Sequence, residues 1–163
     1  MTGANRVLMV LGMLGAIVVG CAPGIAQEKP VDNMQIVLEK IRADKKLLVA
    51  DNMQLTEAEA KAFWPVYSQY QDELYLLRLR TAQLIKDYGD AFDQMSNDMA
   101  KRLLDEYMKN EELMLKLRQD YLPKFRAVLP EVKVARYYQI ENKINAALAY
   151  ELAARIPLVI PAK

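Results

Sequence analysis

Residues 55–91 read LTEAEAKAFWPVYSQYQDELYLLRLRTAQLIKDYGDA. Thr56 is followed three residues later by Glu59, which is the spacing of a capping box at the start of a helix. Apolar and aromatic side chains then recur at alternating intervals of four and three residues, the repeat of a helix that packs against others along most of its length. The predicted core stripe is Phe63, Tyr67, Tyr70, Leu74, Leu77, Thr81, Leu84, Tyr88 and Ala91.

Prolines mark two points at which the predicted helices should bend. Pro65 lies inside the helix described above and removes a backbone donor, so a kink is expected at residues 61–64. Pro123 should bend a second long helix, which begins after its cap residue, Ser96. The two longest predicted helices are therefore both bent by proline.

Two shorter helices complete the prediction, one from Asp32 to Asn52 and one from about Pro130 until Pro157 ends it. The inward-facing residues are predicted to be Ile36, Val37, Ile41, Leu47 and Leu48 in the first helix, Met99, Leu103, Tyr107, Met114, Leu117 and Tyr121 in the third, and Tyr137, Ile140, Ile144, Leu148 and Leu152 in the fourth. No segment alternates as a strand does. The prediction is an all-α domain over residues 27–156, with four helices in an elongated, hairpin-like bundle that forms a dimer.

The first 26 residues have the composition of a secretory signal. Arg6 is the only charged residue before Glu28, and residues 7–19 are apolar apart from glycine, a run too short to cross roughly 30 Å of hydrocarbon. Residues 24–26, Gly-Ile-Ala, favour cleavage before Gln27. The sequence therefore predicts a periplasmic protein.

An alternative reading of the same segment is a lipoprotein signal. Residues 18–21, Val-Val-Gly-Cys, resemble a lipobox, so that the signal would end at Gly20 and a lipid on Cys21 would anchor the protein to a membrane. Cys21 is the only cysteine, so the exported domain has no disulfide and must be held together by its core.

Charge and histidine content exclude several classes of function. Lys plus Arg number 22 and Asp plus Glu 21, without a basic stripe, so nucleic-acid binding is not expected. The chain has no histidine, which excludes histidine-based triads and nearly all conventional zinc sites. Without an activated nucleophile or a carboxylate pair placed in a cleft, no enzyme activity, catalytic residue or cofactor is predicted.

Two groups of residues offer metal ligands, although no metal site is predicted. Oxygen ligands gather near a helix junction in Asp87, Asp90, Asp93, Asn97 and Asp98. Their spacing is not that of an EF-hand, and a link rich in cap residues explains them equally well. Thioethers that suit Cu(I) or Ag(I) gather in Met95, Met99, Met108 and Met114. Methionine more often fills a core or lines an adaptable binding surface.

The segment Leu55-Thr56-Glu57-Ala58-Glu59 resembles the LTxxQ motif, which names a family of bacterial periplasmic helical proteins that includes Spy and CpxP. Glu59 stands where that family has Gln, and either side chain can close a capping box. Residues 95–99, with Ser96 at the cap, and residues 128–131 are weaker echoes of the motif.

This Spy/CpxP-like resemblance extends over residues 35–155 in the order and length of the helices. It implies thin, curved dimers of long bent helices, whose concave face binds unfolded clients without ATP or contacts the sensor domain of an envelope-stress kinase. Zinc-responsive relatives use histidines, which this chain lacks.

The predicted function is that of an exported, ATP-independent chaperone or envelope-stress accessory protein. Its predicted client-binding residues are Tyr70, Leu77, Met99, Met108 and Met114, and its helix-cap motif consists of Leu55, Thr56, Glu59 and Ser96. One alternative is a structural adaptor of a fixed envelope complex, for which the apolar tail at residues 157–163, with Leu158, Val159 and Ile160, serves as a hook. A second alternative is a metal-responsive periplasmic protein that uses methionines or carboxylates.

Overall fold

The computed structural model describes residues 30–160, with side chains from residue 41 onward. The helices are α2 (Pro30–Met53), α3 (Glu57–Ala91), α4 (Asn97–Arg126) and α5 (Glu131–Arg155), with a single 3-10 turn at Phe92–Gln94 between α3 and α4. Residues 30–160 contain no strand, so the all-α prediction is confirmed. The predicted signal, Cys21, and the side chains of Ile36 and Val37 lie outside the described part.

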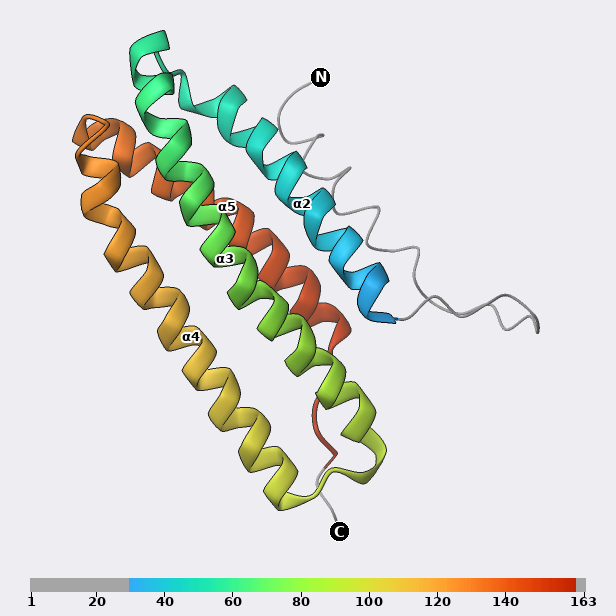
Figure 1. Cartoon of the computed structure of the whole chain (residues 1–163). Coiled ribbons are helices and arrows are strands. Elements are labelled where there is room, and N and C mark those ends of the chain that lie inside the picture. The colour runs from blue at the N-terminus through green and yellow to red at the C-terminus, as the bar shows by residue number, and fades with distance from the viewer. Residues whose placement is uncertain (1–29, 161–163) are drawn as a thin grey trace, which may run out of the picture.

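The four helices lie along one long axis, and successive helices run in opposite directions (Figure 1). α3 and α4 lie side by side along most of their length, α2 packs against α3 and α5, and α4 also contacts α5. The result is an elongated four-helix bundle. Contacts between helices that are neighbours in sequence favour fast folding.

Both predicted helix caps are present. The Thr56 hydroxyl accepts a hydrogen bond from the Glu59 amide at 3.3 Å, and the Thr56 amide donates to the Glu59 carboxylate at 2.8 Å, which completes the capping box. At the start of α4, the Ser96 hydroxyl accepts from the Met99 amide at 3.1 Å. α3 continues as one helix through Pro65, and α4 continues through Pro123. The bends expected at these prolines stay predictions.

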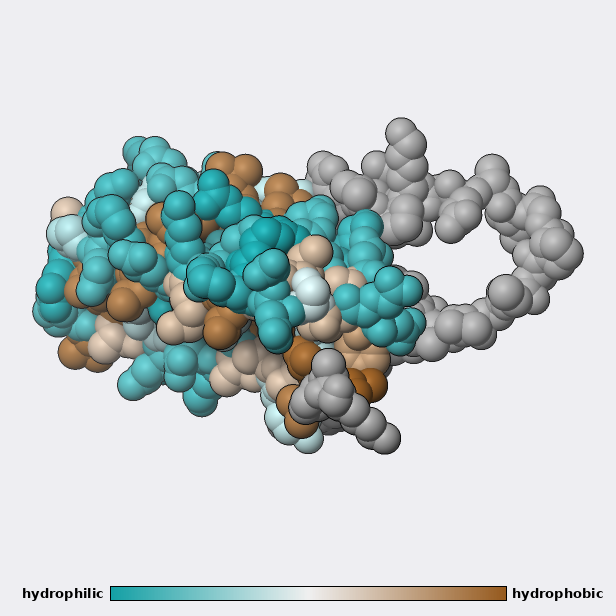
Figure 2. Space-filling model, turned by 90° about the horizontal axis from the view of Figure 1, so that it is seen from below, coloured by the Kyte–Doolittle hydropathy of each residue, from teal (hydrophilic) through white to brown (hydrophobic). Residues whose placement is uncertain are grey.

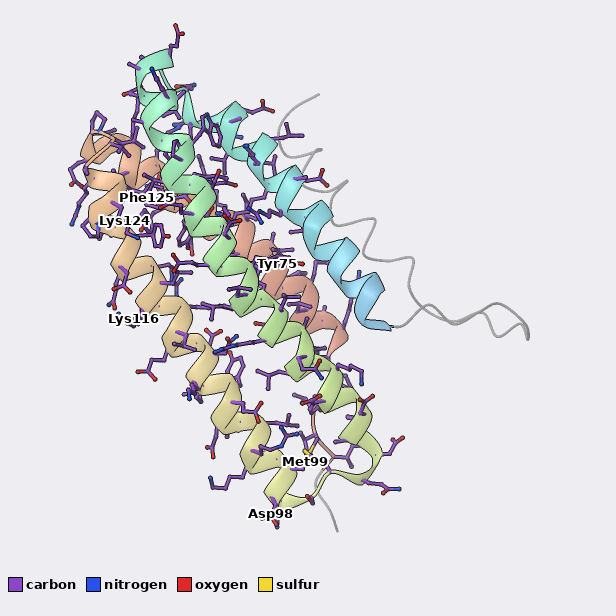
Figure 3. All side chains as sticks on the ribbon, in the orientation of Figure 1. Tyr75, Asp98, Met99, Lys116, Lys124 and Phe125 are labelled. Atoms are coloured by element: carbon purple, nitrogen blue, oxygen red, sulfur yellow. The ribbon has the colours of Figure 1, made fainter. Side chains whose placement is uncertain are left out.

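The core is dominated by aromatic rings and lies at the end of the bundle where α2 joins α3 and α4 joins α5. The ring centroids of Phe125 in α4 and Tyr137 in α5 are 4.6 Å apart with the rings tilted, and Phe63 of α3 meets Tyr137 edge-on at a centroid distance of 5.3 Å. Phe125 lies near this end of α4, whereas Met99 lies near the opposite end (Figure 3). The remaining buried apolar residues of this core are Val49, Met53, Tyr67, Tyr70, Leu74, Leu117, Tyr121, Leu129 and Val134.

The predicted inner face of α2 was partly wrong. Leu47 is 65% exposed, while the buried positions of the described part of α2 are Lys45, Val49 and Met53, spaced four residues apart. The prediction selected apolar residues, but Lys45 takes an inward position because a buried carboxylate on α5 pairs with it. In the other helices most predicted inward residues are buried or half-buried, and the exposed ones, Tyr107 and Leu152, lie in the groove described next.

Candidate functional site

A groove opens between α3, α4 and α5 at the end of the bundle away from the aromatic core. α5 has 25 residues against 35 in α3, so the last part of the α3–α4 pair extends beyond the end of α5. The groove has a cavity volume of about 450 Å³ in this region, which we call its apolar part. The apolar part is lined chiefly by Leu84, Ile85, Leu103, Leu104, Tyr107, Leu152, Ile156 and Val159.

A second region of about 220 Å³ adjoins the apolar part in the direction of the core. The two regions share four lining residues, Thr81, Glu111, Ala149 and Leu152, and therefore form one groove. We call the second region the cationic part because two arginines line it, Arg78 from α3 and Arg118 from α4. The other residues that line only this part are Tyr70, Leu74, Met114, Asn145 and Leu148.

Apolar side chains on the rim of the groove are open to solvent. Leu104 is 60% exposed and Tyr107 is 50% exposed on α4, and Leu152 of α5 is 40% exposed. Seen from the end of the bundle in Figure 2, apolar surface is visible between the charged side chains. Single exposed apolar residues are ordinary, but apolar residues grouped around a cavity indicate a surface that binds something.

The C-terminal tail borders the same groove. After α5 ends at Arg155, the Tyr88 hydroxyl of α3 donates a 2.7 Å hydrogen bond to the Pro157 carbonyl. Ile156 and Val159 contribute to the lining of the apolar part. Leu158 is 89% exposed and turns away from it. The tail is therefore held against α3 as an extended segment that is only partly buried.

A buried ionic cluster fixes α5 against α2 and α3 behind the groove. Lys45 of α2 forms a 2.7 Å ion pair with Glu141 of α5, and both side chains are almost fully buried, at 4% and 6% exposure. Gln71 of α3 accepts from the Lys45 ammonium at 3.1 Å and donates to the Glu141 carboxylate at 3.1 Å. Burial lowers the pKa of Lys45, an effect that the Glu141 carboxylate opposes.

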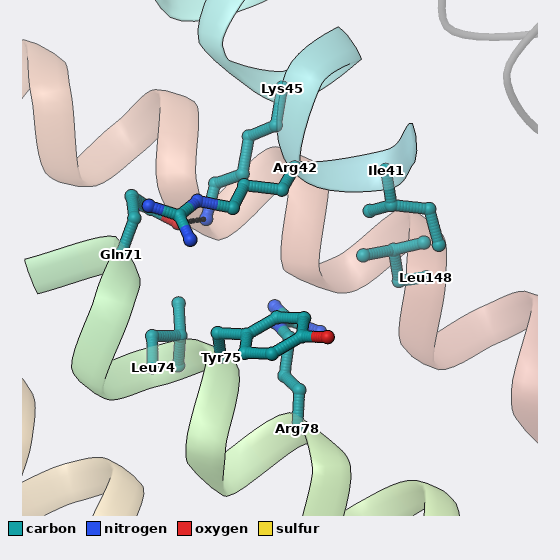
Figure 4. Close-up of a pocket in the computed structure, with 8 residues that line it drawn as sticks. All are labelled: Ile41, Arg42, Lys45, Gln71, Leu74, Tyr75, Arg78 and Leu148. Carbon is teal, nitrogen blue, oxygen red and sulfur yellow. Dashed lines mark hydrogen bonds between the residues drawn. The ribbon is translucent and has the colours of Figure 1, made fainter. Parts of the chain in front are cut away.

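Beside this cluster is a small cavity of about 20 Å³, large enough for one water molecule (Figure 4). Arg42 and Lys45 approach it from α2, and Tyr75 and Arg78 from α3. The Arg78 guanidinium donates to the Asn145 amide oxygen of α5 at 2.5 Å. Arg78 therefore lies between this cavity and the cationic part of the groove, since it lines both.

The predicted client-binding residues lie in different environments in the structure. Tyr70 is buried in the aromatic core and its ring also borders the cationic part, as does Met114. Leu77 is partly buried against the core, and Met108 is 60% exposed on α4. The Met99 sulfur lies 3.1 Å from an Arg102 nitrogen. The structure thus brings Tyr70 and Met114 together at the cationic part, whereas Leu77, Met99 and Met108 do not line the groove.

Sequence reasoning assigned about half of the residues that line the groove to the helix core. Leu84, Tyr88, Leu103, Tyr107 and Leu152 all belong to the predicted inward stripes. The signal that separates them from the core is polar: Thr81 on α3 and Asn110 on α4 interrupt the two stripes at the same level. On the core side of this pair the stripes are buried or half-buried, and on the other side Leu84, Tyr88, Leu103 and Tyr107 line the apolar part of the groove.

Three of the four methionines that the sequence offered as possible metal ligands lie far apart in the structure. Met99, Met108 and Met114 lie on one helix, and a rise of about 1.5 Å per residue separates neighbours among them by roughly 9 to 13 Å, too far to share one ion. Among the side chains that the structure describes, from residue 41 to 160, no three histidine, cysteine, aspartate or glutamate residues are close enough to hold a metal ion. Asp87 and Asp90 lie instead beside Arg102 and Lys86, respectively.

No helix in the described part of the chain is both long and apolar enough to cross a membrane. Comparison with protein-family models, with curated proteins and with solved structures finds no match to this chain. Its function must therefore be argued from the groove and from the residues that form it.

Proposed function

We propose that this protein is an exported, ATP-independent helical chaperone or envelope-stress accessory protein that binds apolar segments of unfolded polypeptides. The observation that carries the proposal is the apolar part of the groove, about 450 Å³ in volume, with Leu104 and Tyr107 exposed on its rim. Binding sites commonly measure about 300–1,000 Å³. Transferring one leucine side chain from water into such a site contributes about 1.5–3 kcal/mol, enough for weak binding of varied sequences.

The resemblance to the LTxxQ-motif family belongs to the same proposal, together with a periplasmic location, a hairpin-like shape and bends at the two internal prolines. The Thr56–Glu59 capping box at the start of α3 supports it, as does the order of the four helices. Dimer formation is also part of the proposal. Met108 and Leu115, which are 60% and 50% exposed on α4 and do not line the groove, provide apolar surface that a second copy could cover.

The alternative of a structural adaptor is favoured by a different observation. Leu158 and Ile160 of the tail are 89% and 68% exposed, so they are available to an outside partner. An adaptor of this kind would yield one saturable partner in a crosslinked pull-down. That partner should be lost in Leu158→Ser and retained in Leu104→Glu, whereas the opposite pattern is expected of a chaperone that uses the groove.

The deciding experiment measures suppression of aggregation of an unrelated, thermally unfolding protein by the purified chain, without ATP and at near-equal molar ratio. Leu104→Glu should weaken suppression about tenfold, because it places a charge on the rim of the apolar part. Leu76→Glu is the matched control, since Leu76 is 61% exposed on α3 and does not line the groove. Absence of suppression at large excess, or equal losses in both variants, would contradict the proposal.

A further inference from the structure

The two ends of the groove differ in chemistry, and this difference defines a class of ligand. The apolar part is lined almost entirely by aliphatic and aromatic side chains. The cationic part is lined by Arg78 and Arg118, with Glu111 as the single carboxylate that faces them. A ligand that fills both parts therefore meets an apolar surface at one end and an excess of positive charge at the other.

Neither arginine is neutralised by an ion pair within the described residues. Arg78 is bonded to the neutral amide of Asn145, and the nearby Glu141 carboxylate is engaged by Lys45 and Gln71. Arg118 is exposed, and among the described residues its guanidinium forms no ion pair, while its backbone carbonyl accepts a hydrogen bond from the Tyr138 hydroxyl. Guanidinium groups bind carboxylates through charge-assisted hydrogen bonds, which are roughly twice as strong as neutral ones.

The tail shows which kind of chain fits the apolar part. Ile156 and Val159 already line this part, from a segment that Pro157 keeps out of a helix and that the Tyr88 hydroxyl holds through a backbone carbonyl. An extended apolar polypeptide therefore makes suitable contacts there. The described residues of the tail, 156–160, do not line the cationic part, so within the described part of the chain the two arginines are open to a ligand from outside.

We propose that the groove binds an extended apolar polypeptide segment with a carboxylate beside it, the apolar side chains in the apolar part and the carboxylate at Arg78 and Arg118. This inference rests on the proposed function and specifies the substrate class of the same groove. Polypeptide segments in which an aspartate or glutamate adjoins three or four aliphatic residues are the preferred clients. Segments that carry lysine or arginine at that place are repelled.

The test uses two labelled peptides, acetylated and amidated at their ends, with the sequences Ile-Pro-Leu-Val-Ile-Asp and Ile-Pro-Leu-Val-Ile-Asn. Their affinities for the full chain are measured by fluorescence anisotropy. The acidic peptide should bind about fivefold more tightly than the amide peptide at low salt, and the ratio should shrink as salt screens the charges. Arg118→Gln should lower the ratio toward one, because only Arg78 is then left to bind the carboxylate. Arg80→Gln, an exposed arginine of α3 that does not line the groove, should leave it unchanged.

The possible results separate this inference from the function on which it rests. Equal binding of the two peptides to the unaltered chain, or a ratio that persists in Arg118→Gln, would overturn the inference and leave peptide binding intact. If neither peptide binds, both the inference and the proposed function of the groove fail. Displacement of the acidic peptide by laurate at lower concentrations than by unlabelled peptide would assign the site to fatty acids, and so would also overturn it.

Discussion

Glu59 has two partners at the start of α3. Its carboxylate closes the capping box with the Thr56 amide at 2.8 Å and also accepts from the Lys133 ammonium of α5 at 2.5 Å. The hydrogen bond from Lys133, followed by that from the Thr56 backbone, lowers the pKa of Glu59 from 4.5 to about 2. The capping box was predictable from the spacing of two residues, but the pairing with Lys133, 74 residues further along the chain, was not.

Glu59→Gln should therefore weaken the pH dependence of the free energy of unfolding at acid pH. The folded-state pKa lies below the ordinary value, so the charged form of Glu59 contributes stability that is fully present above about pH 4.5 and is lost as the pH falls toward 2. Glutamine keeps the cap but loses the ion pair, so the variant should be slightly less stable at pH 7, with a smaller change between pH 4.5 and 2. Urea unfolding followed by circular dichroism at several pH values measures this.

Glu57→Gln is the control, because Glu57 is an exposed acid in the same helical turn without the Lys133 contact. In this variant the free energy of unfolding should change with pH between 4.5 and 2 as steeply as it does in the unaltered protein. A slope in Glu59→Gln as steep as that of the unaltered protein would show that Lys133 does not engage Glu59 in solution.

At the scale of the helices, polar residues at inward positions decide how the elements align. Asn110 of α4 donates to the Thr81 hydroxyl of α3 at 2.9 Å, so the polar interruption of the α3 stripe faces a polar partner. Lys45, Gln71 and Glu141 join α2, α3 and α5 in the same way. The apolar repeats predicted which residues form helices and most of the core. They could not predict these polar contacts, because a buried charge is recognisable only from its partner on another helix.

Lys45→Met should be strongly destabilising because it leaves the Glu141 carboxylate buried without its counter-ion. Loss of one partner of a buried pair costs about 3–5 kcal/mol, whereas the double variant Lys45→Met/Glu141→Leu should unfold within about 1–2 kcal/mol of the unaltered protein or be more stable. Guanidinium unfolding measures both. Lys116→Met is the control, since its pair with Asp120 is exposed and should contribute less than about 1 kcal/mol. An equal loss of unfolding free energy in Lys45→Met and Lys116→Met would contradict the burial of the Lys45–Glu141 ion pair.

The whole molecule combines a closed end with an open one. At the closed end all four helices contribute to the aromatic core, and at the open end α3 and α4 face a groove bordered by α5 and the tail. The helix order was predictable, because caps and apolar repeats are local signals. The groove was not predictable from the sequence, because the residues that line it recur at the same intervals as the residues of the core. What distinguishes them is their position beyond the Thr81–Asn110 contact, where α3 and α4 continue past the end of α5 (Figure 1).

This asymmetry should appear in amide hydrogen exchange. Residues 103–109 and 114–120 lie equally far from the two ends of α4, so fraying affects them alike. The first segment borders the apolar part of the groove. The second contains Leu117 and adjoins Tyr121, both in the core, and its Met114 and Arg118 border the cationic part. Opening the groove end exposes less buried surface, so amides at 103–109 should exchange at least about tenfold faster. A bound apolar peptide without a carboxylate should slow exchange more at 103–109, which borders the apolar part, than at 114–120. Equal rates without peptide would mean that the bundle opens as one cooperative unit, and that the groove end is as firmly packed as the aromatic core.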